Sequence, residues 1–260
     1  MARLPRVGRL GIKECVFGCG RPATSKEDVW PRWLLKRFRA PTAGLYATVG
    51  EDTYADPKQK RIPLKCVCVE CNTGWMKRLE DESIPVLSLL GQDLTLPLGL
   101  DDQVLISAWA LKMAMLWEYF GPPSRTLYHL EGDREGMRSR TIPANTTVWL
   151  ARYGGAPMLF SSVADGTDDL RLPGADTTFR AYATDIVFGR LMIQVLSRRS
   201  LMHDARLMVD PVPGPWEQCA VTVWPPRSGG VAWPPRLTLV RDVPFEAFRR
   251  RWPRLEEASG

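Results

Sequence analysis

The stretch Cys66-Val67-Cys68-Val69-Glu70-Cys71-Asn72-Thr73-Gly74-Trp75-Met76 decides the fold expected for the first part of this chain of 260 residues. Within it, Cys68 and Cys71 have the C-x-x-C spacing of a zinc-binding turn, and Asn72 follows the second cysteine directly. The residues after Asn72 fit the first turns of a helix, with Trp75 and Met76 facing inward. We therefore predict a metal-binding turn that leads straight into a helix.

A second cysteine pair, Cys15 and Cys19, lies upstream with C-x3-C spacing, and glycines beside it permit a sharp turn. Four thiolates from the two pairs would complete a tetrahedral zinc site of the structural kind, which keeps no open position for water. Cys66 could compete as a ligand, because Cys66 and Cys68 also form a pair. C-x-C is the poorer fit, so the predicted zinc ligands are Cys15, Cys19, Cys68 and Cys71.

Composition and charge limit the class of protein. A hydrophobic fraction of 45% and a charged fraction of 25% are ordinary for a globular protein. No run of apolar residues is long enough for a membrane span, and the basic N-terminus lacks the apolar core of a signal peptide. We expect a cytoplasmic protein without a membrane partner. Spaced cysteine pairs in that reducing setting favour metal over disulfides.

The positive charge of the chain is concentrated near its start. Residues 1–80 contain 16 Lys/Arg and 8 Asp/Glu, a balance of +8, whereas the other 180 residues contain 19 and 21, a balance of −2. Such an excess in the cysteine-bearing segment indicates a polyanionic partner such as nucleic acid. The alternative is a solvated basic surface with no partner.

An acidic doublet, Glu27-Asp28, precedes Val29-Trp30-Pro31. Pro31 disfavours a helical conformation at Trp30 and suits the first turn of a helix that begins there. We therefore predict an extended segment over 27–30 and a helix over 31–38. Residues 40–65, rich in Gly, Pro, Thr and Asp, are expected to form a surface loop with one short strand.

The rest of the chain predicts a second unit. A Pro- and Leu-rich passage over 84–100 is expected to link the two, so the predicted domains are 1–83 and 84–260. Asp101-Asp102 begins a helix over 101–120 that is apolar nearly all round, with Lys112 among its regularly spaced positions, and should be buried. Strands are predicted over 146–153, 157–163, 179–187, 219–224 and 237–240, and residues 190–197 could be helix or strand.

Together these patterns predict an α+β fold: a zinc-stapled unit, then a unit with one long buried helix on an antiparallel sheet. The sequence assigns no role to the second unit, which could select a substrate, sense a ligand or form a homodimer. Cys219 stands alone in a predicted strand and is expected to be a buried small hydrophobe.

The order of these motifs resembles the zinc-knuckle branch of the HNH (ββα-metal) endonucleases, which have a cysteine pair, then Glu-His-x-x-Pro, then Cys-x-x-Cys-Asn. Here the corresponding residues are Glu27-Asp28-Val29-Trp30-Pro31 and Cys71-Asn72-Thr73-Gly74. The resemblance covers roughly residues 15–80. It implies a ββα-metal fold for that segment and cleavage of phosphodiester bonds in nucleic acid. DNA is favoured over RNA as the partner, although the sequence does not fix this choice.

The resemblance also implies roles for three residues. Glu27 matches the metal-binding acid and Asn72 the metal-binding asparagine of the family, and such hard oxygen ligands favour Mg²⁺ or Mn²⁺. Asp28 stands where the family has its general-base histidine. A carboxylate, with a reference pKa of about 3.9 against about 6.5 for imidazole, is the weaker base near neutral pH.

Four outcomes follow from the aspartate at position 28. Asp28 could act as a weaker base, or join Glu27 as a second metal ligand. The site could be inactive, leaving a module that only binds nucleic acid, or a histidine could arrive from the second unit, which contains His129 and His203. A zinc-stapled protein-interaction domain is the remaining interpretation.

Overall fold

The computed structural model of the chain describes residues 12–38, 45–49, 52–56, 63–119, 127–155, 159–171, 178–200, 215–249 and 251. For 45–49, 52–56, 159–171, 178–180 and 199–200 it describes the backbone alone. Predictions that concern His203 therefore lie outside the described residues.

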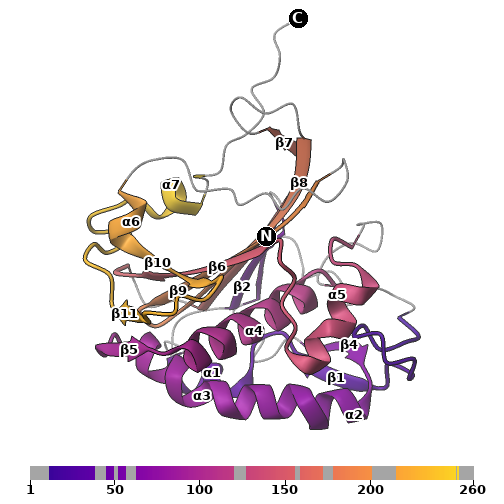
Figure 1. The fold of residues 1–260 in the computed structure, drawn as a ribbon. Helices are drawn as coiled ribbons and strands as arrows, with labels where there is room; N and C mark the ends of the chain where they lie inside the picture. Colours follow the sequence, from indigo (N-terminus) through magenta and orange to yellow (C-terminus); the bar gives the residue numbers. More distant parts are fainter. Residues whose placement is uncertain are drawn as a thin grey trace, which may run out of the picture.

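A large twisted sheet forms one layer of the molecule (Figure 1). Among the described residues it has seven strands in the order β10-β6-β9-β8-β7-β2-β3. Neighbouring strands pair antiparallel except β2 and β7, which pair in parallel. The strands are β2 (Leu45–Val49), β3 (Asp52–Asp56), β6 (Thr146–Arg152), β7 (Leu159–Arg171), β8 (Thr178–Phe188), β9 (Leu191–Ser200) and β10 (Ala220–Trp224).

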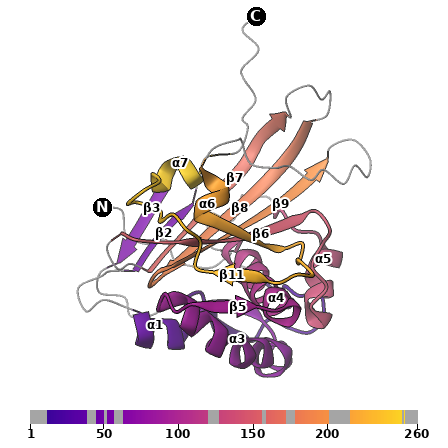
Figure 2. The ribbon, with the colours of Figure 1, turned by 60° about the vertical axis from the view of Figure 1, so that its left-hand side comes forward.

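Two long helices lie below this sheet in Figure 1, α4 (Leu100–Trp117) against the sheet and α3 (Lys77–Gly91) against α4. Two short strands, β5 (Leu96–Leu98) and β11 (Val231–Trp233), pair at one end of α4, as Figure 2 shows. The remaining helices are α1 (Arg32–Phe38), α5 (Glu131–Gly136), α6 (Trp216–Cys219), α7 (Phe245–Arg249) and the 3₁₀ turn η2 (Met137–Ser139). None of the described helices combines the length and apolar character that a membrane crossing requires.

The side chains of the central strands alternate between two hydrophobic clusters, as the period of a strand requires. Leu150 and Ile193 pack with α4 in the larger cluster. Their neighbours Ala151 and Met192 pack on the other face with Phe248 of α7. The predicted α+β class and the predicted buried helix are confirmed, and Asp102 accepts a hydrogen bond from the Gly99 amide where α4 begins (3.0 Å).

The cysteine-bearing segment forms a strand pair followed by a helix. β1 (Ser25–Asp28) pairs antiparallel with β4 (Pro63–Val67), with Glu27 opposite Leu64. After β4, the helical segments α2 (Val69–Cys71), η1 (Asn72–Met76) and α3 follow without a break, apart from a kink at Gly74, whose φ and ψ are −92° and −108°. α1, β2 and β3 lie between the two strands in sequence.

Several sequence predictions for this region are wrong. Residues 84–91 continue α3 rather than forming a linker, although Pro85 removes one helical hydrogen bond. Burial of Val86, Leu87 and Leu90 on one face of α3 offsets that loss. The described parts of 40–65 form three strands instead of one. For 190–197, where the sequence left both helix and strand open, the structure has strand from Leu191 onward. Residues 237–240 form no strand, because Val240 has a left-handed φ of 76° that ends extended structure.

The two predicted units share one hydrophobic core. The predicted boundary after residue 83 falls inside α3, and β2 and β3, from the first predicted unit, join the sheet of the second. One continuous cluster includes Trp30 and Met76 together with Trp109 and Phe188. Trp33 of α1 meets Trp109 and Phe188 at ring-centroid distances of 6.4 and 6.1 Å. The cysteine-bearing segment therefore packs against α4 and shares its hydrophobic core.

Candidate functional site

Four cysteines from two distant segments converge at one point. Cys15 and Cys19 come from the loop before β1, and Cys68 and Cys71 from the turn between β4 and η1; all four sulfur atoms lie within 4.8 Å of one another. The Cys19 and Cys68 sulfurs are 3.5 Å apart. Zinc–sulfur bonds of about 2.3 Å in a tetrahedron require sulfur atoms about 3.8 Å apart. The cluster could therefore hold a metal ion such as zinc.

The local backbone prepares both turns for such a site. Gly18 and Gly20 have left-handed φ values of 61° and 69°, which a side chain would disfavour. The amide of Cys71 donates to the sulfur of Cys68 at 3.2 Å. The amide of Val16 donates to the carbonyl of Cys66 at 2.9 Å and so joins the first turn to β4. The cysteine turns are held by hydrogen bonds of their own.

The other two cysteines lie outside this cluster, as the spacing predicted. Cys66 is fully buried, and burial together with the nearby charge of Glu27 raises the pKa of its thiol well above the usual value. Cys219 is also fully buried, and its sulfur donates to the carbonyl of Trp216 at 3.4 Å. Both therefore behave as small apolar side chains.

A second site lies beside the cysteines, in a cavity of ≈ 500 Å³. It opens between β1, the start of α1, and the helical segment from η1 into α3. The predicted residues Glu27, Asp28 and Asn72 all line it. The other lining residues are Lys26, Pro31, Arg32, Trp33, Thr73, Met76, Lys77, Glu80, Asp81 and Ile84.

Asn72 is oriented by β1. Its side-chain nitrogen donates to the hydroxyl of Ser25 at 2.8 Å and to the carbonyl of Lys26 at 3.3 Å. Because both bonds use the amide nitrogen, the Oδ1 atom of Asn72 remains as an acceptor at the cavity. An amide oxygen is a ligand that Mg²⁺ and Mn²⁺ accept.

Glu27 lies against a buried lysine. The Lys112 ammonium is 3.8 Å from Glu27 Oε1 and 2.9 Å from Glu80 Oε2. The side chain of Lys112 is 1% exposed, against 17% for Glu27. Burial raises the pKa of Glu27, as do the charges of Glu80 and Asp28, while Lys112 acts in the opposite direction. Glu27 is thus an acid in a setting with more negative than positive charge.

Glu80 is held by three donors. The indole nitrogens of Trp33 and Trp109 and the ammonium of Lys112 all donate to its carboxylate. For Lys112, burial lowers the pKa, but the charges of Glu80 and Glu27 outweigh it, so that the pKa is raised and the side chain stays charged. Glu80 therefore positions Lys112, and Lys112 positions Glu27.

Asp28 is buried and forms an ion pair. Its Oδ2 atom lies 3.3 Å from Nε of Arg32, four residues later at the start of α1. The side chain of Arg32 is 66% exposed. A pair with one solvent-exposed partner is worth about 0–1 kcal/mol, so Arg32 does not lock Asp28 in place.

Sequence reasoning missed Glu80 and Lys112. The signal for Lys112 was its position: it is a charged residue on a helix whose other faces are apolar. A lysine there must be neutralised, and that requirement points to an acidic partner. The sequence could not identify Glu80 as that partner, because Glu80 lies on α3 and Lys112 on α4.

His129 does not reach the cavity. Its Nδ1 atom bonds Glu118, and its Nε2 atom bonds the hydroxyl of Ser197 at 2.9 Å. Arg134 also bonds Glu118. Burial alone would raise the pKa of Glu118, but His129 and Arg134 outweigh it and lower the pKa. Ser197 is 1% exposed, so this serine–histidine–glutamate chain is a structural network rather than a reactive one. The alternative in which a histidine arrives from the second unit therefore does not hold for His129.

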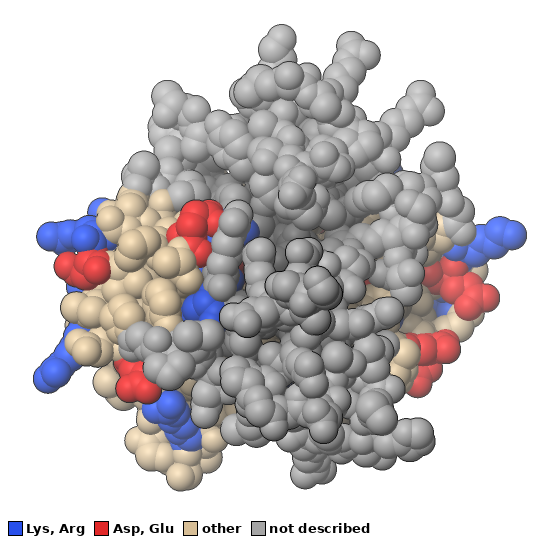
Figure 3. All heavy atoms as spheres, turned by 90° about the horizontal axis from the view of Figure 1, so that it is seen from above, with Lys and Arg blue, Asp and Glu red and all other residues tan. Residues whose placement is uncertain are grey.

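Basic and acidic side chains lie close together both at the site and elsewhere on the described surface. Figure 3 shows one face of the molecule, on which the described basic and acidic side chains lie together on both sides. At the cavity, Lys77 pairs with Asp81 at 2.7 Å. Near the cysteines, Arg21 lies 3.9 Å from Glu70. Part of the positive excess of residues 1–80 is thus balanced locally.

Within the part of the chain that the structure describes, the four cysteines are the one group of three or more His, Cys, Asp or Glu residues close enough to share a metal ion. At the cavity that Glu27 and Asn72 line, a metal would rely on the carboxylate of Glu27 and on the amide oxygen of Asn72.

Comparison with known proteins adds no family: no protein-family model matches the chain, and neither the curated proteins nor the solved structures give a significant match.

Proposed function

We propose that this chain is an HNH-like, metal-dependent endonuclease that hydrolyses phosphodiester bonds in nucleic acid, with DNA as the favoured substrate. One observation carries the proposal: Glu27, Asp28 and Asn72, from a strand and a helix far apart in sequence, line one cavity next to a four-cysteine cluster. The antiparallel pair β1–β4, followed by a helix, supports the proposal, although α1, β2 and β3 separate the two strands in the chain.

Glu27 and the Oδ1 atom of Asn72 would hold Mg²⁺ or Mn²⁺. Such an ion, when bound, stabilises negative charge on the scissile phosphate and the leaving oxygen. The charges of Glu80 and Asp28 favour a cation there, whereas the Lys112 ammonium beside Glu27 opposes it. The cysteine cluster would hold zinc as a structural centre that fixes η1, and hence Asn72, against β1.

The remaining residues of the cavity would bind and orient the substrate. Lys26 and Arg32 line the cavity and are exposed, so they are available to phosphate oxygens on either side of the scissile bond. Asp28 would accept a proton from the attacking water. Because its carboxylate is a weaker base than imidazole, the proposed rate at neutral pH is low.

Cleavage assays test the proposal. The purified chain is incubated with plasmid, single-stranded DNA and RNA, with Mg²⁺ or with Mn²⁺. We expect DNA cleavage that Glu27→Ala and Asn72→Ala abolish and that Asp101→Asn, a change at an exposed carboxylate outside the cavity, leaves intact. Activity equal in all three variants would point to a contaminant, and no cleavage under any metal would refute the proposal.

Asp28→His provides a sharper test, because it restores the residue type of the resembling family. General-base catalysis contributes about 10²–10⁴-fold in total, and Asp28 already supplies part of it, so cleavage near neutral pH should rise by up to that factor. Asp28→Ala should lower it. A lower rate in Asp28→His than in Asp28→Ala would contradict the role of position 28 as the base.

A second candidate function is a nucleic-acid-binding module without catalysis. The observation that favours it is the pairing of both acids: Asp28 with Arg32 and Glu27 with Lys112. This module would bind DNA in EDTA as well as in Mg²⁺, with an affinity that falls steeply with salt. Binding in EDTA together with no turnover, also in Asp28→His, would favour it over the nuclease.

A further inference from the structure

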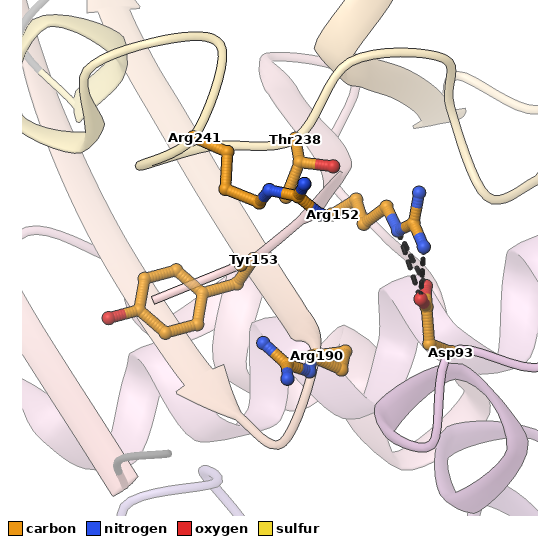
Figure 4. A pocket seen from close by; sticks show the side chains of 7 residues that line it. Asp93, Arg152, Tyr153, Arg190, Thr238 and Arg241 are labelled. Carbon is orange, nitrogen blue, oxygen red and sulfur yellow. Dashed lines mark hydrogen bonds and ion pairs between the residues drawn. The ribbon is translucent and has the colours of Figure 1, made fainter. Parts of the chain in front are cut away.

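Another cavity, of about 350 Å³, lies at the C-terminal end of α3, away from the cavity that Glu27 and Asn72 line. Its walls come from the loop after α3 (Asp93), the end of β6 (Arg152, Tyr153), the turn between β8 and β9 (Arg190) and the loop before α7 (Thr238, Arg241). Figure 4 shows the side chains of Arg190 and Arg241 on opposite sides of an open centre. The sequence patterns singled out none of these residues.

The charge of this cavity is positive. Three arginines line it together with a single carboxylate, that of Asp93, so the lining residues sum to +2. Asp93 is fully engaged by Arg152, whose Nε lies 2.9 and 3.0 Å from its two oxygens and whose Nη2 completes the pair. Nη1 of Arg152 has no hydrogen-bond partner among the described residues, so its N–H groups can still donate to a ligand in the cavity.

Arg190 and Arg241 have no acidic partner among the residues that the structure describes. Both are exposed, and in the described part of the chain neither forms an ion pair; the contact of Arg190 is a weak bond from Nη1 to the carbonyl of Gly155 at 3.4 Å. Burial raises the pKa of the Tyr153 hydroxyl, and the charge of Arg190 opposes this, which puts the guanidinium within electrostatic reach of that ring. Two guanidinium groups thus face one concavity whose single described carboxylate, that of Asp93, is engaged by Arg152.

The walls are held by backbone hydrogen bonds. The amide of Gly154 donates to Leu239 at 3.0 Å, and that of Tyr153 donates to Arg190 at 2.8 Å. Gly154 also allows close approach of the loop, because a Cβ atom there would lie 2.4 Å from a methyl group of Thr238 and 3.1 Å from Arg241. The cavity is therefore formed before a ligand arrives, which lowers the entropic cost of binding.

We propose that this cavity binds a phosphate monoester group. The net charge of +2 matches a monoester, which carries about −1.5 to −2 near neutral pH, better than a phosphodiester with its single charge. Guanidinium groups offer paired donors that fit phosphate oxygens, and the Thr238 hydroxyl lines the same space. The volume accommodates a phosphate with an attached small group.

The phosphate could belong to a free small molecule or to the 5′ end of a nucleic acid strand. Neither source depends on the proposed nuclease, because Glu27 and Asn72 do not line this cavity. α3 separates the two cavities: Ile84 lines one and Asp93, just beyond the helix, lines the other. The helix rises about 10 Å over the seven-residue step from Ile84 to Gly91.

Titration calorimetry tests the proposal with inorganic phosphate, a nucleoside 5′-monophosphate, and one oligonucleotide prepared with and without a 5′-phosphate. Binding of the monophosphate, weakened at least about tenfold by Arg190→Ala and by Arg241→Ala, is the expected result, since each variant removes charge-assisted hydrogen bonds to the phosphate. Arg236→Ala, at an exposed arginine of the same loop that does not line the cavity, is the matched control.

The two sources give different results. A free phosphorylated metabolite predicts that the monophosphate binds at least as well as the 5′-phosphorylated oligonucleotide; a strand end predicts the reverse, with weak binding of the unphosphorylated strand. No phosphate ligand binding at up to about 10 mM, or equal loss in Arg236→Ala, overturns the proposal. Phosphate binding that persists in Glu27→Ala separates this site from the nuclease, so either proposal can fail alone.

Discussion

Lys112 gives the sharpest prediction about the candidate site, because a fully buried cation there holds two acids. At the observed distances of 2.9 and 3.8 Å to Glu80 and Glu27, an effective dielectric of about 20 gives attractions of about 6 and about 4 kcal/mol. Desolvation of the three groups cancels much of this. Removing one partner from a buried ion pair nevertheless costs about 3–5 kcal/mol, because the remaining charge is left uncompensated.

We therefore expect Lys112→Met to lower the free energy of unfolding by about 3–5 kcal/mol. At about 2–4 °C per kcal/mol for a chain of this size, the melting temperature should fall by about 6–20 °C. Urea unfolding followed by tryptophan fluorescence measures the change. Lys77→Met is the matched control: its ion pair with Asp81 is as short, at 2.7 Å, but exposed, and its loss should cost less than about 1 kcal/mol.

A double variant distinguishes lost charge from lost packing. Lys112→Met/Glu80→Gln removes the negative charge of Glu80 and keeps one acceptor oxygen, which can serve one of the indoles of Trp33 and Trp109. If uncompensated charge causes the loss, the double variant should recover a large part of it. A double variant as unstable as Lys112→Met, or a Lys77→Met variant that loses as much, would refute the assignment of Lys112 as the cation that holds this site together.

Three further predictions concern the fold around the sites. Cys68→Ser should lose the zinc that emission spectrometry detects and melt at a lower temperature, whereas Cys66→Ala should keep its zinc; equal zinc contents would contradict the ligand set. The pKa of Glu118 is lowered from 4.5, so its ionised form stabilises the fold above that pH and the benefit is lost as the pH falls. The stability difference between wild type and Glu118→Gln should accordingly shrink from about pH 7 to about pH 3 in urea titrations, and a constant difference would exclude this role. Gly189→Ala, at a φ of 57° with a Cβ 2.2 Å from the Gly91 carbonyl oxygen, should cost at least about 2 kcal/mol, while Gly132→Ala, with open space around it, should stay within about 1 kcal/mol in the same measurement.

Local sequence patterns predicted the cysteine cluster and the elements next to it. The spacing of Cys15, Cys19, Cys68 and Cys71 identified the four residues that converge, and it excluded Cys66. Short-range rules were sufficient because each turn is built within a few residues. The helix after Pro31 and the buried helix after Asp101-Asp102 followed in the same way from caps, proline and periodicity.

The sequence alone also named Glu27, Asp28 and Asn72, but only the tertiary structure brought them to one cavity and supplied Lys112 and Glu80 behind them. Ion pairs between helices depend on how those helices pack, which no local pattern encodes. Likewise, the parallel pairing of β2 with β7 joins segments more than 100 residues apart and merges two predicted units into one core. Residue spacing thus determined which four cysteines converge, whereas long-range packing decided the charges near them and the partners of each strand.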